Sequence, residues 1–356
     1  MKGQSLLIGA GLLLLLANPA GADPELSGAG SSAAAPIYKA WAQEYKKRGG
    51  WSIAYDPVGS GAGMTKIRQR QVDFGASDVI SPKAELVKDG LVMFPTVISG
   101  VVPIINLPRL NTQLKLSGEL LAKIFMGEIT QWNAPEIVAA NPGLNLSGQP
   151  IRVVCRSDGS GTTYNFSDYL SKVSPAWKAR FGVASKHQWP SSFITAKGSS
   201  EVSAAVRNTP GAIGYIDYNY VLEDGLTGVQ VRNAAGYFVA ATSEGFSKAV
   251  RNSGWFSRGD FSETLTNMAG ESSWPITMAT YVAVPRIARD TAQAMQTLRF
   301  FVWAYINGDA LATQARFIPL PDKVQAKAFR EIYSVLGEHG ELIGVEALSV
   351  LTKMAP

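Results

Sequence analysis

The chain has 356 residues, 46% of them hydrophobic and 17% charged, and its net charge at pH 7 is +5. This length exceeds what one hydrophobic core usually fills, so we expect two lobes. The positive charge is diffuse, and its densest cluster, residues 46–48 (KKR), closes a predicted helix, where cations suit the helix dipole. The composition argues against a nucleic-acid partner and favours a small anionic ligand.

Residues 1–22 have the features of a secretory signal peptide. Lys2 precedes an apolar run at 6–16, and the small residues 20–22 (AGA) follow as a cleavage site. The run is too short to span a bilayer, so we expect an exported, periplasmic protein that begins near Asp23. Cys155 is the only cysteine, which excludes an internal disulfide and a lipid anchor after the signal.

The rest of the chain alternates short apolar runs with amphipathic stretches, the pattern of an α/β protein. Strands are predicted at residues 52–55, 72–76, 101–106, 151–155, 212–215 and 277–284. Helices are predicted at residues 35–48, 64–71, 117–125, 164–172, 199–208, 291–306 and 323–335. Proline and glycine near 95–103 and 270–275 indicate two crossings between lobes. We therefore expect one lobe from residues 23–98 and 274–356 and the other from 99–273.

Glycine and hydroxyl residues gather three times just before or within the start of a predicted helix. The stretches are GAGSS (28–32), GSGAG (59–63) and DGSGTT (158–163). The first turn of a helix has unpaired N–H groups and a partial positive charge, glycine lets an anion approach the backbone, and hydroxyls add donors. Three such ends that converge would form a cage for an oxyanion.

Each stretch taken alone is better explained as an ordinary helix cap or turn. Two further features favour a binding site. Arg156 and Asp158 lie beside the third stretch, and Asp78 ends the strand VDFGASD (72–78), where open α/β sheets place ligand-binding residues. Asp78 by itself would also be explained as a helix or turn cap.

Seven motifs together resemble the family of periplasmic phosphate-binding proteins that serve bacterial phosphate ABC transporters. They are GAGSS, VGSGAG, VDFGASD, FPTVISGVVPIIN (94–106), RSDGSGTT (156–163), PGAIGYIDY (210–218) and WPIT (274–277). The resemblance runs in order from about Leu26 to Pro321. It implies a type II periplasmic-binding-protein fold, in which two α/β lobes joined by two hinge crossings close over one dehydrated phosphate, with no cofactor. It also implies permease and ATPase partners in the membrane, and we expect a monomer.

The resemblance assigns the phosphate ligands to both lobes. They correspond to Ser32, the amide of Ala33, Ser60 and Asp78 from one lobe, and to Arg156, Ser160, the amide of Gly161 and Thr162 from the other. Asp158 matches the family aspartate that pairs with the arginine. Many relatives have Thr-Phe where this chain has Ser32-Ala33, a change that keeps the amide donor but alters the packing around the turn.

Asp78 places a negative charge in an anion site, which makes sense if the ligand carries a proton. Phosphate has an O–H to donate near neutral pH, whereas sulfate would face the carboxylate with no hydrogen between two acceptors. Sites that require a hydrogen bond reject an analogue lacking it by roughly 10⁴ to 10⁵. Arsenate is protonated like phosphate and remains an alternative ligand, while sulfate and molybdate are disfavoured.

The main alternative to a binding protein is an enzyme that binds phosphate. Such an enzyme needs a nucleophile with a base, or metal ions, for its reaction. His187 and His339 lie far apart without ligand spacing, and the chain contains neither a G-x-S-x-G elbow nor a Gly-Lys pair for a P-loop. We therefore expect no enzyme activity, and we expect both histidines to be surface or packing residues and Cys155 to be a buried strand residue. A secreted structural or adhesive protein with the same fold is a further alternative, which weak or absent phosphate binding would reveal.

Overall fold

The computed structural model describes residues 25–107, 110 and 113–349. The predicted signal peptide lies outside these residues. The strands are β1 (Glu25–Gly30), β2 (Ser52–Asp56), β3 (Phe74–Ser77), β4 (Leu91–Ile105), β5 (Lys115–Leu116), β6 (Arg152–Arg156), β7 (Ile194–Ala196), β8 (Ala212–Asp217), β9 (Thr227–Gly228), β10 (Gln230–Arg232), β11 (Phe238–Val239) and β12 (Thr277–Pro285). The helices are α1 (Ala35–Lys47), α2 (Ser60–Arg68), α3 (Lys83–Asp89), α4 (Gly118–Phe125), α5 (Pro135–Ala140), α6 (Gly161–Val173), α7 (Pro175–Arg180), α8 (Gly198–Asn208), α9 (Tyr218–Glu223), α10 (Ser243–Arg251), α11 (Gly254–Arg258), α12 (Thr291–Asn307), α13 (Asp309–Gln314), α14 (Asp322–Tyr333) and α15 (Ile343–Ser349).

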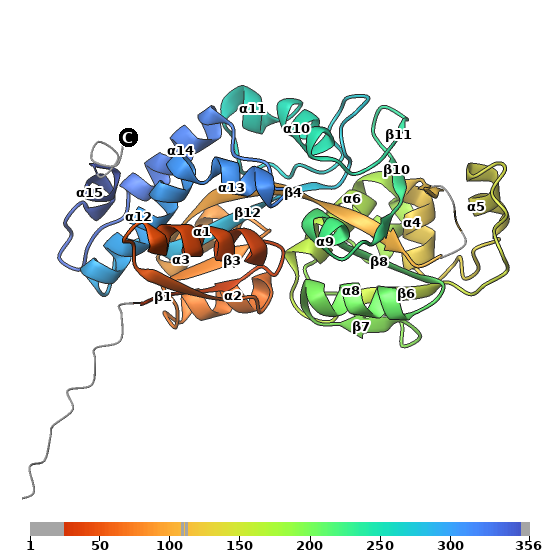
Figure 1. The fold of residues 1–356 in the computed structure, drawn as a ribbon, viewed down its shortest axis with the longest axis horizontal. Helices are drawn as coiled ribbons and strands as arrows, with labels where there is room; N and C mark the ends of the chain where they lie inside the picture. The colour runs from red at the N-terminus through yellow and green to blue at the C-terminus, as the bar shows by residue number, and fades with distance from the viewer. Residues whose placement is uncertain (1–24, 108–109, 111–112, 350–356) are drawn as a thin grey trace, which may run out of the picture.

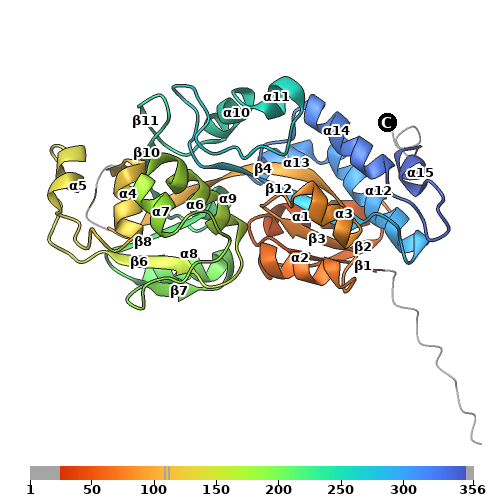
Figure 2. The ribbon, with the colours of Figure 1, turned by 180° about the vertical axis from the view of Figure 1, so that it is seen from behind.

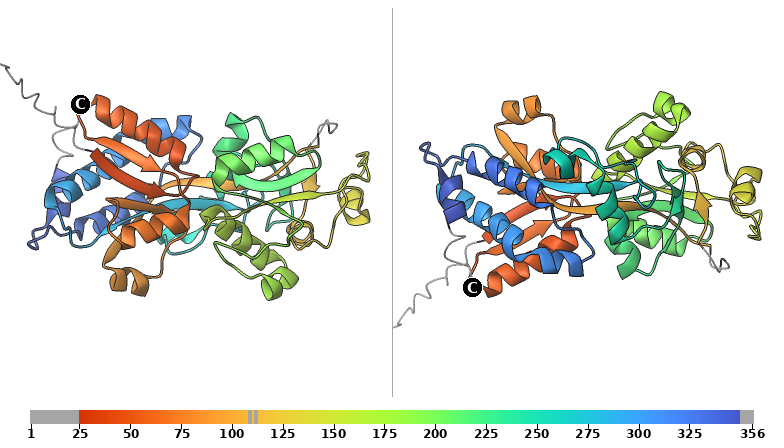
Figure 3. Two further views of the ribbon diagram at one scale, coloured as in Figure 1. Left: turned by 90° about the horizontal axis from the view of Figure 1, so that it is seen from below. Right: turned by 90° about the horizontal axis from the view of Figure 1, so that it is seen from above.

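One mixed sheet runs through the molecule in the order β2-β1-β3-β12-β4-β8-β6-β7, with β9 also paired to β4. β1 lies parallel to β2 and β3, β6 lies parallel to β7 and β8, and the central β4 is antiparallel to β12 and β8. Helices cover both faces of the sheet (Figure 3). The segments that follow β3 and β6 meet between the two halves of the sheet, since Asp78, directly after β3, lies against Gly161, five residues after β6.

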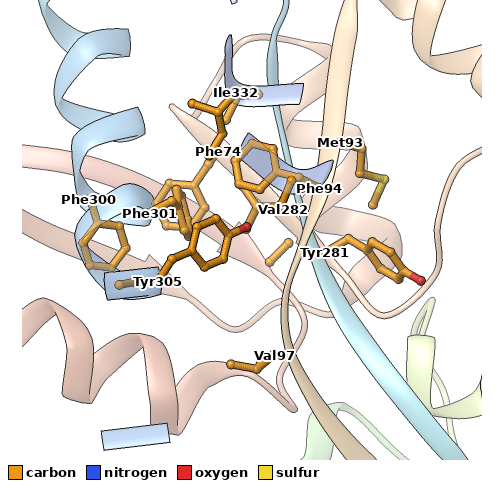
Figure 4. Packing of buried hydrophobic residues seen from close by; sticks show 14 of the residues in the cluster. Phe74, Met93, Phe94, Val97, Tyr281, Val282, Phe300, Phe301, Tyr305 and Ile332 are labelled. Carbon is orange, nitrogen blue, oxygen red and sulfur yellow. The ribbon is translucent and has the colours of Figure 1, made fainter. Parts of the chain in front are cut away.

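Two hydrophobic cores fill the two ends of this sheet. In the first, Phe74 from β3, Phe94 from β4 and Phe301 from α12 pack edge to face, with ring centroids of Phe301 5.0 Å from Phe74 and 5.8 Å from Phe94 (Figure 4). In the second, Phe166 of α6 stacks on Tyr215 of β8 at 4.4 Å. We call the parts built around these cores the first lobe and the second lobe; both are visible from behind in Figure 2.

The strand β4 belongs to both lobes. Its 15 residues are all buried; residues 91–100 pair with β12, and residues 101–105 pair with β8 (Figure 1). Where β4 passes between the lobes, the Val101 N–H donates to the carbonyl of Ile276 at 2.8 Å, and the Trp274 indole N–H donates to the carbonyl of Val101 at 3.0 Å. The two segments expected to cross between lobes therefore lie side by side.

The division of the chain between lobes stays a prediction. Val101, Val154 and Ile276 belong to the second core, whereas Trp255 and Leu265 pack in the first core although they lie between the two expected crossings. The segment around α11 thus contacts the first lobe. Within the described residues, no helix combines the length and the apolar character needed to cross a membrane.

Candidate functional site

The three stretches rich in glycine and hydroxyl residues lead into three helices, as the sequence predicts. The first joins β1 to α1, the second opens α2, and the third joins β6 to α6. The second and third stretches touch across the lobes, since the Gly61 N–H donates to the carbonyl of Gly159 at 2.9 Å. Gly59 has φ +92°, and a Cβ there would lie 2.3 Å from Asp158 Oδ2, so only glycine fits this approach.

Asp78 lies directly after β3 and is only 4% exposed. Its Oδ1 accepts from the Thr280 hydroxyl at 2.6 Å, and its Oδ2 accepts from the hydroxyls of Ser31 at 2.7 Å and Ser60 at 3.4 Å. Burial raises the pKa of Asp78 to about 6, and the nearby charge of Asp217 acts in the same direction. The hydroxyl bonds and the positive charge of Arg156 lower this pKa in part. Asp78 therefore lies in a poorly hydrated environment, where neutral hydroxyl groups donate hydrogen bonds to its carboxylate oxygens.

Arg156 ends β6 and is 2% exposed. Its Nε and Nη2 donate to the two oxygens of Asp158 at 2.7 and 2.6 Å, a bidentate ion pair. Burial would lower the pKa of Arg156, but its bonds to Asp158 hold that pKa above the ordinary value. Burial likewise opposes ionisation of Asp158, yet the arginine lowers the pKa of Asp158 overall. The predicted pairing of these two residues is thus present, and it fixes the plane of the guanidinium.

The start of α6 packs directly against the first lobe. Ser160 caps the helix by accepting from the Thr163 N–H at 3.1 Å. The Gly161 N–H donates to Ser60 Oγ at 3.2 Å, and a Cβ on Gly161 would lie 2.4 Å from Asp78 Cβ. Ser60, Asp78 and Gly161 therefore meet between the lobes.

Thr162 lies on the other side of this helix start, with its hydroxyl 3.5 Å from Arg156 Nη1. Ser32 and Ala33 are buried in the turn before α1. Ser32 Oγ lies 2.9 Å from Ser199 Oγ at the start of α8, and Ala33 packs with the second core although it lies in the chain of the first lobe. All eight predicted ligands are thus buried, most of them linked by contacts between the lobes, whereas their contact with a ligand stays a prediction.

Comparison with known proteins assigns the chain to a family. The family model described as a PBP superfamily domain matches residues 17–296. The phosphate-binding protein PstS of Xylella fastidiosa (strain Temecula1) is 42% identical over 298 residues, which cover 83% of this chain and 82% of that protein. The chain belongs to the PstS phosphate-binding protein family.

A second PstS relative, from Haemophilus influenzae, is 40% identical over 300 residues and covers 84% of this chain and 90% of its own. Among solved structures, the phosphate-binding protein of Stenotrophomonas maltophilia is 22% identical with a TM-score of 0.66, covering 92% of this chain and 98% of its own. The type II periplasmic-binding-protein fold expected from the sequence is therefore confirmed for this PstS-family chain.

Four polar residues of the site were not foreseen from the sequence. Ser31 and Thr280 donate to Asp78, and Ser199 and Asp217 belong to a second polar group opposite Ser32. Asp217 ends β8 within the PGAIGYIDY motif, so its position at a strand terminus was a usable signal. Ser199 and Thr280 carry no comparable signal, because their partners lie 18 to 202 residues away.

The other residues singled out in the sequence occupy packed or surface positions. Cys155 is fully buried in β6, where burial raises the pKa of its thiol. His187 packs among the rings of Trp177 and Trp189, and His339 is exposed. Both histidine predictions and the cysteine prediction are confirmed. Among the described residues, no group of three or more His, Cys, Asp or Glu side chains is placed to hold a metal ion.

Proposed function

We propose that the chain is an extracytoplasmic receptor that binds inorganic phosphate between its two lobes and delivers it to an ABC-type phosphate import permease. The observation that carries this proposal is the meeting of Asp78 from the first lobe with Arg156 and the start of α6 from the second, all of them buried. The PstS relatives are named as phosphate-binding proteins, which supports a receptor rather than an enzyme.

The positive part of the proposed site comes from one side chain and three helix starts. Arg156 supplies a full charge in a fork suited to two oxygens, and Asp158 keeps that fork in place. The starts of α1, α2 and α6 contribute backbone N–H groups and partial positive charge. The assigned ligand groups are the hydroxyls of Ser32, Ser60, Ser160 and Thr162 and the amides of Ala33 and Gly161.

Asp78 supplies the selective part of the site. As a buried acceptor it favours a ligand that brings a proton, and it leaves a proton-free oxyanion with an unfavourable contact. The hydroxyls of Thr280 and Ser31 already occupy part of its acceptor capacity and keep it in place. Phosphate and arsenate meet this requirement, and sulfate does not.

The proposed partners and location follow from the same role. One protein of similar fold is known as a high affinity periplasmic phosphate-binding protein. We place this receptor in the periplasm as a monomer without a cofactor. Its closed, loaded form, in which both lobes hold the anion, is the state that we propose the permease and its ATPase receive.

Calorimetric titration of the phosphate-free protein with phosphate, arsenate and sulfate tests the proposal. We expect one site per chain for phosphate and arsenate, and sulfate binding weaker by several orders of magnitude. Absence of phosphate binding would overturn the receptor function. Comparable affinity for sulfate would keep an oxyanion receptor but remove the role of Asp78.

A further inference from the structure

Asp217 is a second buried carboxylate at the site, and the assigned phosphate ligands do not include it. It ends β8 and is fully buried. Its Oδ2 accepts from the Ser199 hydroxyl at 2.7 Å, and its Oδ1 accepts from the Thr162 hydroxyl at 3.2 Å. Both of its oxygens thus accept hydrogen bonds from hydroxyl groups, and one of these hydroxyls belongs to Thr162, an assigned ligand of the anion.

The bond to Asp217 fixes which way the Ser199 hydroxyl points. A serine hydroxyl has a single proton, and that of Ser199 goes to the carboxylate. In the 2.9 Å contact between Ser199 Oγ and Ser32 Oγ, Ser32 must therefore be the donor. The Ser199 N–H donates in turn to Ser32 Oγ at 3.2 Å. Asp217 thus turns Ser199 into an acceptor for the hydroxyl of Ser32.

This contact joins the two lobes beside the anion site. Ser32 precedes α1 in the first lobe, and Ser199 opens α8 in the second. The neighbouring Gly198 N–H donates to Asp158 at 3.1 Å, so the start of α8 is also tied to the partner of Arg156. The Tyr220 hydroxyl donates to the carbonyl of Ser32 at 3.2 Å, a further bond across the same junction.

We propose that Asp217 and Ser199 form a latch with Ser32 that slows opening of the closed receptor. Asp217 acts as a positioning residue, because it orients the hydroxyls of Thr162 and Ser199. The proposal rests on the phosphate-binding function. In the loaded state the single proton of Ser32 is shared between the anion and Ser199 Oγ in a three-centre bond, while the Ser199 N–H still donates to Ser32 Oγ, so Ser199→Ala removes one of the two bonds of the bridge.

The test compares two serines of the same helix. Ser199→Ala removes the hydroxyl of the latch, whereas the control Ser203→Ala removes a buried hydroxyl one turn later that donates to Asp224 within the second lobe. Dissociation of radiolabelled phosphate is followed after a chase with excess unlabelled phosphate. We expect Ser199→Ala to speed dissociation about three- to tenfold with little change in the association rate. Ser203→Ala is expected to leave dissociation within about twofold of wild type.

A double-mutant cycle separates the latch from a general structural effect. In a Ser32→Ala background, Ser199→Ala should change the dissociation rate by less than about twofold, because its partner is already gone. Asp217→Asn keeps the shape but loses one acceptor oxygen, and we expect it to speed dissociation several-fold by the same route. Asp217→Asn therefore tests the latch if Ser199→Ala does not fold.

Three outcomes would overturn the latch. They are dissociation from Ser199→Ala at the rate of Ser203→Ala, an equal effect of Ser199→Ala with and without Ser32, and an Asp217→Asn protein that releases phosphate at the wild-type rate. Each of them requires a wild-type protein that binds phosphate. Failure of the wild-type protein to bind phosphate would instead overturn the proposed function.

Discussion

At the scale of single residues, the proposed selectivity for phosphate over sulfate depends on Asp78. It is a buried carboxylate within reach of the charge of Arg156, and its contacts in the structure are the hydroxyls of Thr280, Ser31 and Ser60. Hydroxyl groups can reorient, so these bonds stabilise the carboxylate without neutralising it. A ligand that arrives with its own proton therefore gains a bond that a proton-free ligand lacks.

Asp78→Asn should narrow the preference for phosphate over sulfate. Asparagine removes the charge-assisted bond from the phosphate O–H, worth about 1.5–3 kcal/mol, but it also relieves the repulsion between two negative groups. We expect phosphate affinity to stay within about tenfold, or about 1.4 kcal/mol, while sulfate binding improves much more. Competition titration measures both affinities.

The matched control for this variant is Asp73→Asn, which changes a carboxylate before β3 that is bonded to Ser27 away from the site. The control should keep the wild-type preference. If Asp78→Asn also excludes sulfate as strongly as wild type does, the selectivity resides elsewhere, and the donors at residues 160–162 become the better candidates.

The raised pKa of Asp78 also predicts how stability depends on pH. With a pKa of about 6 in the folded protein and 3.8 as the ordinary value, the folded state holds this proton more tightly than the unfolded chain. The contribution of Asp78 to stability is therefore present below about pH 4 and is lost as the pH rises through 6. Relative to Asp78→Asn, wild type should lose about 2–3 kcal/mol of unfolding free energy between pH 4 and 7. Denaturant unfolding at several pH values in phosphate-free buffer measures this gap, and a gap that does not change with pH would contradict the assignment.

At the scale of elements, the start of α6 does three things at once. Ser160 caps the helix, Gly161 permits contact with the first lobe, and Thr162 faces the arginine. The helix itself follows from local sequence, because a serine cap and the apolar face of Phe166, Tyr169 and Leu170 favour it. Its closeness to Asp78 follows only from the way the lobes meet.

Gly161→Ala should block closure without damaging the fold. A Cβ at this position would lie 2.4 Å from Asp78 Cβ and 2.8 Å from Ser60 Oγ, both on the opposite lobe. An open form avoids both contacts, so we expect phosphate affinity to fall at least about tenfold. The melting temperature of the phosphate-free protein should stay the same or rise slightly, because alanine is the better helix residue.

The control for this variant is Gly245→Ala in the first turn of α10, where the nearest atoms to a new Cβ lie 3.3 Å away or more. Calorimetry should show wild-type affinity for this control. Wild-type affinity in Gly161→Ala would mean that the contact between α6 and Asp78 is not part of the binding-competent state.

At the scale of the whole molecule, the bonds between lobes and the assigned ligands involve the same residues. Ser32, Ser60, Asp78 and Gly161 each contact the other lobe in this structure. A ligand held by both sides therefore favours the closed arrangement through its higher affinity for it. Since β4 and the segment before β12 join the lobes side by side, a small change at this junction can open the site.

Phosphate should make the receptor more compact and more stable. In solution scattering, we expect the radius of gyration to fall when phosphate is added to wild type and to change less in Gly161→Ala at the same phosphate concentration. The melting temperature of wild type should rise with the logarithm of phosphate concentration above the dissociation constant. An unchanged radius of gyration in a wild-type protein that demonstrably binds phosphate would contradict the closure mechanism.

Local patterns in the sequence predicted seven of the 15 helices in the described residues, and the resemblance of its motifs to the phosphate-binding family assigned the candidate ligands. The predicted helices at 35–48, 199–208 and 291–306 agree with α1, α8 and α12 to within about one residue at each end, because apolar spacing and end residues act over a single turn. The three helix starts rich in glycine and hydroxyl residues were recognisable for the same reason. The strand prediction was weaker at β4, where only 101–106 was expected and the strand begins at Leu91. A strand buried on both faces lacks the alternation that marks its length.

Only the tertiary structure decided which polar groups form hydrogen bonds with one another. Thr280 reaches Asp78 from 202 residues away, and Ser199 meets Ser32 across 167 residues. No local pattern encodes such pairs, since they depend on how two lobes with separate cores come together along β4 and β12. The sequence by itself therefore determined the residue types that give the site its chemistry and several of the elements that carry them. The hydroxyls that orient Asp78 and the Asp217–Ser199 group were decided by packing, because hydrogen bonds between distant segments form only once the cores bring donor and acceptor atoms within about 3 Å of each other.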